Sequence, residues 1–256
     1  MRIPRIHTRQ SLRANAVVEL EPGPSQHLSR VLRMQVGDSL ILFDGSGGQY
    51  PASIHAIGRT VVTATTGSYE AIERESGLHL QLGIAISRGD RMDWVVQKAT
   101  ELGVSSIAPL ATERTEVRLG GERSEKKLRH WQQVASSACE QCGRNRLPEI
   151  LAPQDLGLWL GSVQADVRLV LHHTAVNSDP GMSAPASAAL LVGPEGGLTP
   201  AEISAAGLAG FSSLQLGPRV LRTETAPLAA IAILQARWGD MGATGARAEA
   251  EAKGWD

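Results

Sequence analysis

Two glycine-rich loops with charged side chains lie near the carboxyl end of the sequence. They read Val192-Gly-Pro-Glu-Gly-Gly-Leu198 and Leu216-Gly-Pro-Arg-Val-Leu-Arg-Thr-Glu-Thr-Ala226. Glycine lets the backbone approach a flat ring closely and present its N–H and C=O groups to that ring. Each loop alone is also a common structural turn, but together they predict a ligand pocket built from backbone, with arginines and carboxylates beside it.

The residues before each loop predict strands. Residues 188–192 are a continuous apolar run and residues 167–171 are apolar apart from Arg168, a pattern typical of parallel strands covered on both faces. Residues 214–216 supply the next strand. Ligands of open α/β sheets bind at the carboxyl ends of the strands, which is where both loops begin. The sequence has neither a G-x-G-x-x-G fingerprint nor a G-x-x-x-x-G-K-[ST] loop, which disfavours a Rossmann or P-loop nucleotide site.

Helices are expected around these strands. Thr199 and Glu202 form a capping box with Pro200 at the first helical position, which is a clear helix start. An earlier apolar stripe begins after Asp90 and ends at Gly103. Further helices are predicted over residues 124–142 and, with Pro227 in the first turn, over about 223–238.

The amino-terminal part has a different pattern. From residue 16 to about residue 69, short β-prone runs separated by turn residues predict a small β-barrel. A charged stretch then reads as a linker, and strands alternating with helices follow it. We therefore expect a β-barrel domain over residues 1–70, a linker over 71–77, an α/β domain over 78–240 and a flexible tail over 241–256.

The overall charge is nearly balanced. A formal net charge of -1 and a pI near 6.7 exclude a field that attracts nucleic acid from all sides. One local excess of arginine lies in the first 33 residues and could bind phosphates, the alternative being scattered solvated side chains. Its members are Arg2, Arg5, Arg9, Arg13, Arg30 and Arg33.

The sequence also indicates a compartment. No apolar run approaches the roughly 20 residues of a membrane helix, and the first residues do not resemble a secretory signal. We therefore expect a cytoplasmic protein without a membrane partner. Cys139 and Cys142 are the only cysteines, and their spacing without further ligands predicts neither a disulfide framework nor a metal site.

Four stretches in order resemble the RsmE family of 16S rRNA (uridine-N3) methyltransferases. They are RMDWVVQKATELGV at 91–104, EQCGR at 140–144, GPEGG at 193–197 and LGPRVLRTETA at 216–226. Residues 4–6, 27–33 and 37–38 are similar to that family's PUA-like barrel, so the resemblance spans nearly the whole chain. It implies an α/β fold with a SPOUT-type parallel sheet and a C-terminal trefoil knot, preceded by a small PUA-like β-barrel that binds RNA.

The resemblance also implies ligands and partners. The cofactor would be S-adenosylmethionine (SAM), lying bent in the knot, and the RNA would be 16S rRNA within the small ribosomal subunit. A homodimer through the knotted face would use an apolar patch for which Ala229, Ala230, Ile233 and Leu234 are candidates. The cofactor-binding residues implied are Leu171, His172, Gly193, Glu195, Gly196, Leu216, Gly217, Val220, Leu221 and Arg222.

The reaction suggests roles for further residues. Methyl transfer from a sulfonium to uracil N3 is an in-line displacement in which the nitrogen loses its proton, so the enzyme must orient the reactants and stabilise the forming anion. Arginines suit that second task. We expect Arg222 and Arg144 to perform it, with Glu224 as the proton acceptor or as the residue that orients them. The RNA-binding candidates are Arg5, Arg9, Arg30, Arg33 and Arg88.

Two departures from the family pattern and three alternatives accompany this interpretation. Arg88 stands where a lysine is usual, which keeps the charge but not the geometry, and Cys142 replaces the commoner serine.

The alternatives are a non-catalytic RNA-binding protein with a degenerate knot domain, methylation of a different RNA base, and a dinucleotide-dependent oxidoreductase. Intact glycines and arginines in both loops argue against the first, and the missing glycine fingerprint argues against the last.

Overall fold

The computed structural model describes residues 3–116, 120–172 and 184–242. The chain divides into two compact units, each treated separately below. Unit 1 comprises residues 1–75 and 136–147, and unit 2 comprises residues 76–135 and 148–256. The domain boundaries predicted from the sequence stay a proposal, and most of the predicted tail lies outside the described residues.

Unit 1 is built on one five-stranded sheet. The strands are β1 (Arg5–His7), β2 (Val17–Glu19), β3 (Ser39–Phe43), β4 (Tyr50–Ile57) and β5 (Val62–Thr66), in the order β1-β3-β4-β5-β2. A short helix α1 (Pro22–Gln26) leads into a π-helical turn η1 (His27–Val31). Alternate residues of β3 and β5 point into a core that includes Leu40, Leu42 and Val62, as the period-two pattern predicts.

Residues 136–147 complete unit 1. They comprise the last part of α3 (Glu122–Cys142) and the turn that follows it. The backbone N–H of His7 donates to Glu140 Oε1 at 2.9 Å, and Arg5 Nη2 donates to Asn145 Oδ1 at 2.6 Å. Strand β1 and a segment more than 130 residues away in the sequence therefore share polar contacts.

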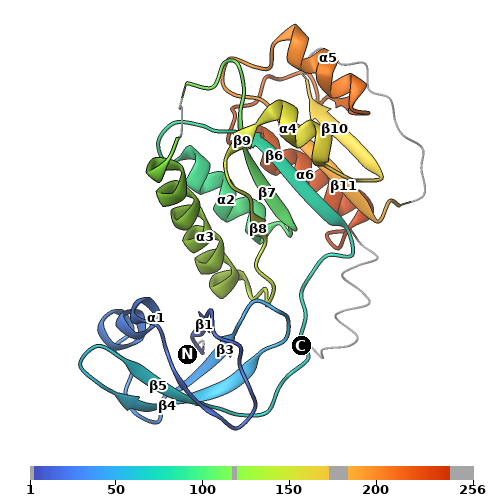
Figure 1. Ribbon diagram of the computed structural model, residues 1–256. Coiled ribbons are helices and arrows are strands. Elements are labelled where there is room, and N and C mark those ends of the chain that lie inside the picture. Colours follow the sequence, from blue (N-terminus) through green and yellow to red (C-terminus); the bar gives the residue numbers. More distant parts are fainter. Residues whose placement is uncertain (1–2, 117–119, 173–183, 243–256) are drawn as a thin grey trace. The chain divides into compact units, whose positions relative to one another are not determined.

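Unit 2 is an α/β fold around a parallel sheet. The order is β12-β10-β11-β6-β7-β8, with β9 also paired to β7, and every pairing is parallel. The strands are β6 (His79–Ala85), β7 (Ser106–Ala111), β8 (Glu149–Ile150), β9 (Gln154–Asp155), β10 (Val167–Leu171), β11 (Ser187–Val192) and β12 (Ser212–Leu214). Figure 1 shows helices on both faces of this sheet, which explains why the central strands β10 and β11 are largely apolar.

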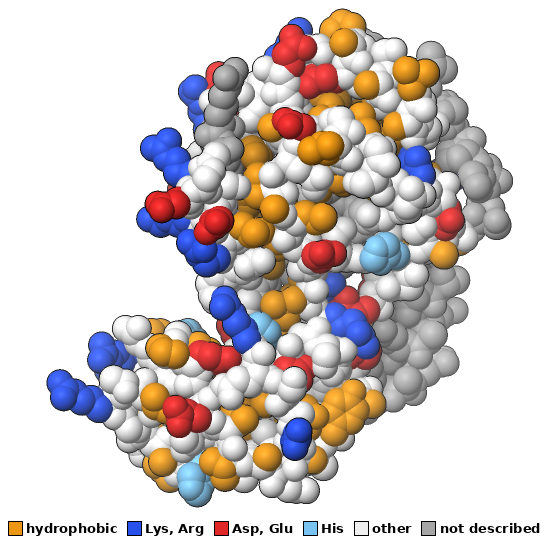
Figure 2. All heavy atoms as spheres, viewed as in Figure 1, with side chains coloured by type: hydrophobic (Ala, Val, Ile, Leu, Met, Phe, Trp, Pro, Cys, Tyr) orange, Lys and Arg blue, Asp and Glu red, His pale blue; other side chains and the backbone are white. Residues whose placement is uncertain are grey.

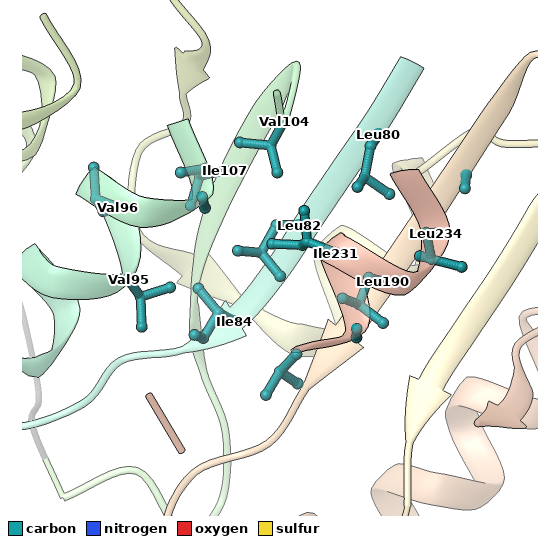
Figure 3. Packing of buried hydrophobic residues seen from close by; sticks show 14 of the residues in the cluster. Leu80, Leu82, Ile84, Val95, Val96, Val104, Ile107, Leu190, Ile231 and Leu234 are labelled. Carbon is teal, nitrogen blue, oxygen red and sulfur yellow. The ribbon is translucent and has the colours of Figure 1, made fainter. Parts of the chain in front are cut away.

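The two faces have separate hydrophobic cores. Helices α2 (Arg91–Glu101) and α6 (Thr225–Trp238) pack with one face of β6 and β11. Figure 3 shows Val95 of α2 near Ile84, and Ile231 and Leu234 of α6 near Leu82 and Leu190. Helices α4 (Leu156–Ser162) and α5 (Pro200–Leu208) cover the other face. In Figure 2, basic and acidic side chains mix over α3, as expected of a solvated helix face.

Most of the helix predictions are confirmed. Gly103, with φ of 83°, follows α2, and Pro227 lies buried in the first turn of α6. Strand β12 ends at Leu214, two residues before the predicted end. Residues 215 and 216 instead begin a loop that lines the cavity described below.

The capping box of α5 is present as predicted. Thr199 Oγ1 accepts from the Glu202 N–H at 3.3 Å, and the Thr199 N–H donates to Glu202 Oε2 at 2.8 Å. We expect Thr199→Ala to lower the free energy of unfolding by about 1 kcal/mol, because the cap acceptor is lost. Denaturant unfolding would measure this. Ser204→Ala, at an exposed position of the same helix, is the matched control, and an equal loss in both variants would contradict the prediction.

Candidate active site

The carboxyl ends of β10, β11 and β12 surround one cavity of about 600 Å³ in unit 2. Both glycine-rich loops line it, together with the two residues that end β10 and follow it. All ten residues that the sequence predicted to bind a cofactor are among its lining residues, as is Glu224. The topology brings them together because parallel strands present their carboxyl ends at one edge of a sheet.

The loop after β11 is shaped by its glycines. A Cβ atom added to Gly193 would lie 2.9 Å from Leu198 Cγ and 3.1 Å from the Leu198 backbone nitrogen, so the loop closes only around a glycine. Gly197 has φ of 69°, and its N–H donates to the Pro194 carbonyl at 2.8 Å. This tight turn leads directly into the capping box of α5.

The loop after β12 turns at Gly217, whose φ of 96° suits glycine. At its far end the Arg222 carbonyl accepts from the N–H groups of Thr225 and Ala226, each at 2.9 Å, and so begins α6. The Arg222 backbone is thus fixed while its side chain is exposed at the cavity. The pocket wall also includes Val220, whose side chain is 84% exposed and hence available to a ligand.

Three lining arginines were not among the predicted site residues: Arg219, which lies in the second glycine-rich loop, and two arginines from other elements. Arg91 begins α2, and its Nη1 lies 2.7 Å from Glu195 Oε1 in the first glycine-rich loop. Arg114 lies in the loop after β7, and its Nη1 donates to the Gly196 carbonyl at 2.7 Å. Arg91 and Arg114 follow strands that end at this same edge, which is the signal that could have identified them.

The predicted RNA-binding arginines fall into two groups. Arg9, Arg30 and Arg33 are exposed in unit 1, and Lys and Arg side chains protrude near α1 in Figure 2, whereas Arg2 lies outside the described residues. Arg33 has φ of 52°, an unusual backbone conformation for a residue with a side chain. Arg5 instead donates to Gln49 Oε1 at 2.5 Å and lies over the Phe43 ring. These contacts occupy part of the Arg5 guanidinium within unit 1.

Arg88 belongs to unit 2. Its Nε pairs with Glu116 Oε2, which joins the loops after β6 and β7, and both side chains are more than half exposed. Arg88 does not line the cavity.

Arg144, the third predicted catalytic residue, lies in unit 1 and does not line the cavity. Its side chain is 5% exposed and forms a forked pair with Glu75, in which Nη2 donates to Oε2 at 2.6 Å and Nε to Oε1 at 3.1 Å. Burial would lower the pKa of Arg144, but the Glu75 carboxylate holds it above its ordinary value. The catalytic role of Arg144 stays a prediction.

The cysteines are free thiols. Burial raises the pKa of the Cys139 thiol to about 12, so this thiol is protonated and unreactive at neutral pH. Among residues 3–116, 120–172 and 184–242, no group of three or more His, Cys, Asp or Glu side chains could hold a metal ion. No helix within those ranges has the length and apolar character to cross a membrane.

Comparison with known families gives two matches. Residues 74–235 match the RNA methyltransferase domain family, and residues 25–65 match the RNA methyltransferase PUA domain family. The first match covers more than half of the chain, including the whole cavity lining.

Full-length relatives agree with these matches. The ribosomal RNA small subunit methyltransferase E of Buchnera aphidicola from Schizaphis graminum is 34% identical, covering 94% of this chain and 98% of the relative. The enzyme of the same name from Bacillus subtilis is 28% identical, covering 89% and 93%.

Solved structures are similar over the same length. The ribosomal RNA small subunit methyltransferase E of Neisseria gonorrhoeae, bound to SAM, is 38% identical with a TM-score of 0.88, covering 93% of this chain and 99% of the other. A protein from Legionella pneumophila in complex with SAM is 40% identical with a TM-score of 0.90, covering 94% and 100%. The predicted fold class, a SPOUT-type parallel sheet preceded by a PUA-like domain, is confirmed.

Proposed function

We propose, from the premise that this chain belongs to the RNA methyltransferase family that includes ribosomal RNA small subunit methyltransferase E, that it methylates N3 of a uridine in 16S rRNA. Family membership makes the chain a SAM-dependent RNA methyltransferase. The choice of base rests on the resemblance of the four motifs. The observation that carries the proposal is the single cavity in which both glycine-rich loops meet.

The cavity suits SAM in size and lining. Its volume of about 600 Å³ lies within the range of small-molecule sites. Gly193 and Gly196 keep the backbone of the first loop free of side chains, and Leu171, Leu216 and Leu221 add apolar surface. We propose that these residues, with the other cofactor-binding residues predicted from the sequence, hold SAM.

Bound SAM supplies an electrophilic methyl group, and the residues of the chain prepare the acceptor. Arg222 would lie beside the uracil and stabilise the negative charge that develops as N3 loses its proton. Glu224, two residues further along the same loop, would accept that proton or orient Arg222. The sequence also predicted Arg144 for this task, whereas its buried pair with Glu75 in unit 1 favours a structural role.

The RNA partner, the compartment and the homodimer are also proposals. The PUA-like unit, with Arg9, Arg30 and Arg33 exposed, would bind 16S rRNA within the small subunit in the cytoplasm. A homodimer would form through the knotted face. Among the candidate residues on α6, Ala230 and Leu234 are buried in the core of unit 2, whereas Ala229 is partly exposed and Ile233 is 48% exposed. Ala229 and Ile233 are therefore the side chains available to a second copy.

The test uses small ribosomal subunits from a strain that lacks its own enzyme. The protein is incubated with these subunits and labelled SAM, and the modified base is identified by mass spectrometry. We expect 3-methyluridine in 16S rRNA. Label on another base, or on no RNA, would refute the proposal.

A substitution tests where SAM binds. We expect Gly193→Ala to raise the dissociation constant of SAM by about tenfold or more, because relieving a close contact of this kind costs about 1 to 3 kcal/mol. The added Cβ would meet the Leu198 backbone nitrogen at 3.1 Å, so the loop itself must move. Calorimetric titration measures the affinity. Gly157→Ala in α4, where an added Cβ meets no atom within 4 Å, is the control, and unchanged affinity in Gly193→Ala would argue against this site.

A further inference from the structure

Arg91 and Arg114 line the cavity but belong to neither glycine-rich loop. Each reaches it from the carboxyl end of a different strand, Arg91 following β6 and Arg114 following β7. Each contacts the loop after β11, at Glu195 and at the Gly196 carbonyl respectively. The two guanidinium groups thus approach adjacent residues of one loop from two separate elements.

The loop that carries Arg114 is held in place by its own hydrogen bonds. The Thr112 N–H donates to Thr115 Oγ1 at 3.0 Å, and the Thr115 N–H donates to the Thr112 carbonyl at 3.1 Å. The Glu113 N–H donates to Glu202 Oε1 at 2.8 Å, so the carboxylate that caps α5 also anchors this loop. Arg114 is therefore presented to the cavity by a fixed turn.

Neither contact occupies its arginine fully. The side chains of Arg91 and Glu195 are 43% and 40% exposed, and ion pairs this exposed typically contribute about 0 to 1 kcal/mol. Arg114 uses one donor on a neutral carbonyl, which leaves most of its guanidinium fork for another acceptor. An anionic ligand could therefore replace Glu195 on Arg91 and add to Arg114 at little cost.

The charge of the cavity indicates such a ligand. Its lining includes the cations Arg91, Arg114, Arg219 and Arg222 and the carboxylates of Glu195 and Glu224, an excess of two positive charges. SAM is itself a net cation, because its sulfonium and ammonium groups outweigh one carboxylate. The excess of arginine is thus not explained by the cofactor. It suits a second ligand that carries negative charge.

We infer that Arg91 and Arg114 bind a phosphodiester of the RNA strand at the cavity and so hold the target nucleotide beside the cofactor. The inference rests on the proposed function and adds an RNA contact within the methyltransferase unit. Arginine suits this task because its planar fork matches two phosphate oxygens. In an alternative role, the two arginines would only hold the loop after β11 in place. Their removal would then weaken SAM binding and leave the salt dependence of RNA binding unchanged.

The experiment compares Arg91→Ala, Arg114→Ala and the double variant in the full chain. RNA affinity is measured with a fluorescent single-stranded segment of 16S rRNA at several salt concentrations, SAM affinity by calorimetry, and the KM for unmodified small subunits by methyl incorporation. Each lost phosphate contact should lower the slope of log affinity against log salt by about 0.7. Arg129→Ala, which removes an exposed arginine of α3 that pairs with Glu125, is the matched control.

In the double variant, we expect a lower slope of log RNA affinity against log salt and a KM for small subunits raised about tenfold. The affinity for SAM should stay within about twofold of that of the parent. Arg91→Lys should retain most of the slope, because it retains the charge. Weaker SAM binding with an unchanged salt slope would overturn the inference in favour of loop bracing. If the parent methylates no subunit but the variants still show a weaker salt dependence of RNA binding, the proposed function is wrong and the contact between the two arginines and a phosphate is supported.

Discussion

Arg222→Ala should lower the turnover of uridine methylation by about 10² to 10³-fold, the usual effect of removing one donor that stabilises a developing anion. The side chain of Arg222 is exposed at the cavity and can be removed without creating a void in the core. Its carbonyl, which begins α6, is unaffected by the change. Single-turnover methylation of small subunits at saturating SAM would measure the rate, and the thermal unfolding midpoint should stay unchanged.

Two further measurements separate anion stabilisation from other roles of Arg222. If the arginine stabilises the uracil anion, the rate of Arg222→Ala should rise with pH more steeply than that of the parent, because a more basic solution favours loss of the N3 proton without help. Arg222→Lys keeps the charge but not the planar fork and should recover part of the rate. Equal rates for Arg222→Ala and the parent would remove Arg222 from the mechanism.

The sequence predicted the cavity because its signals are local. Gly193 directly follows the apolar run of β11, and Gly217 lies three residues after the end of β12. Parallel strands place such loops at one edge of the sheet. The Thr199 and Glu202 cap is equally local, since both partners lie within one helical turn. A contact can be predicted from the sequence where its partners and their signal occupy the same few residues.

The missed features depend on contacts between distant segments. Arg91 reads as an ordinary first-turn residue of α2, and only the order of β6 beside β11 brings it to Glu195. The end of α3 is similar, because its apolar stripe predicts a helix but does not identify the partner of each turn. That Glu140 contacts the His7 backbone follows from the path of the chain and not from periodicity.

The motif at residues 140–144 and the structure suggest different roles for Arg144. The motif placed it near the reaction, yet its guanidinium is buried in unit 1 against Glu75. Breaking a buried pair by removing one partner leaves an uncompensated charge and typically costs about 3 to 5 kcal/mol. We therefore expect Arg144→Ala to lower the stability of unit 1 by about that amount, with any loss of methylation following from local unfolding.

The measurement must report on unit 1 itself. Within the described residues, the tryptophans at 94, 131, 159 and 238 all lie in unit 2 and cannot report on unit 1. Hydrogen exchange of peptides from β1 and β3 is therefore the suitable probe. Replacing both partners, as in Glu75→Gln with Arg144→Met, should restore part of the protection, because no buried charge is then left alone. If Arg144→Ala instead keeps full protection and loses turnover, the buried arginine acts in the reaction, and Glu75 serves to orient it.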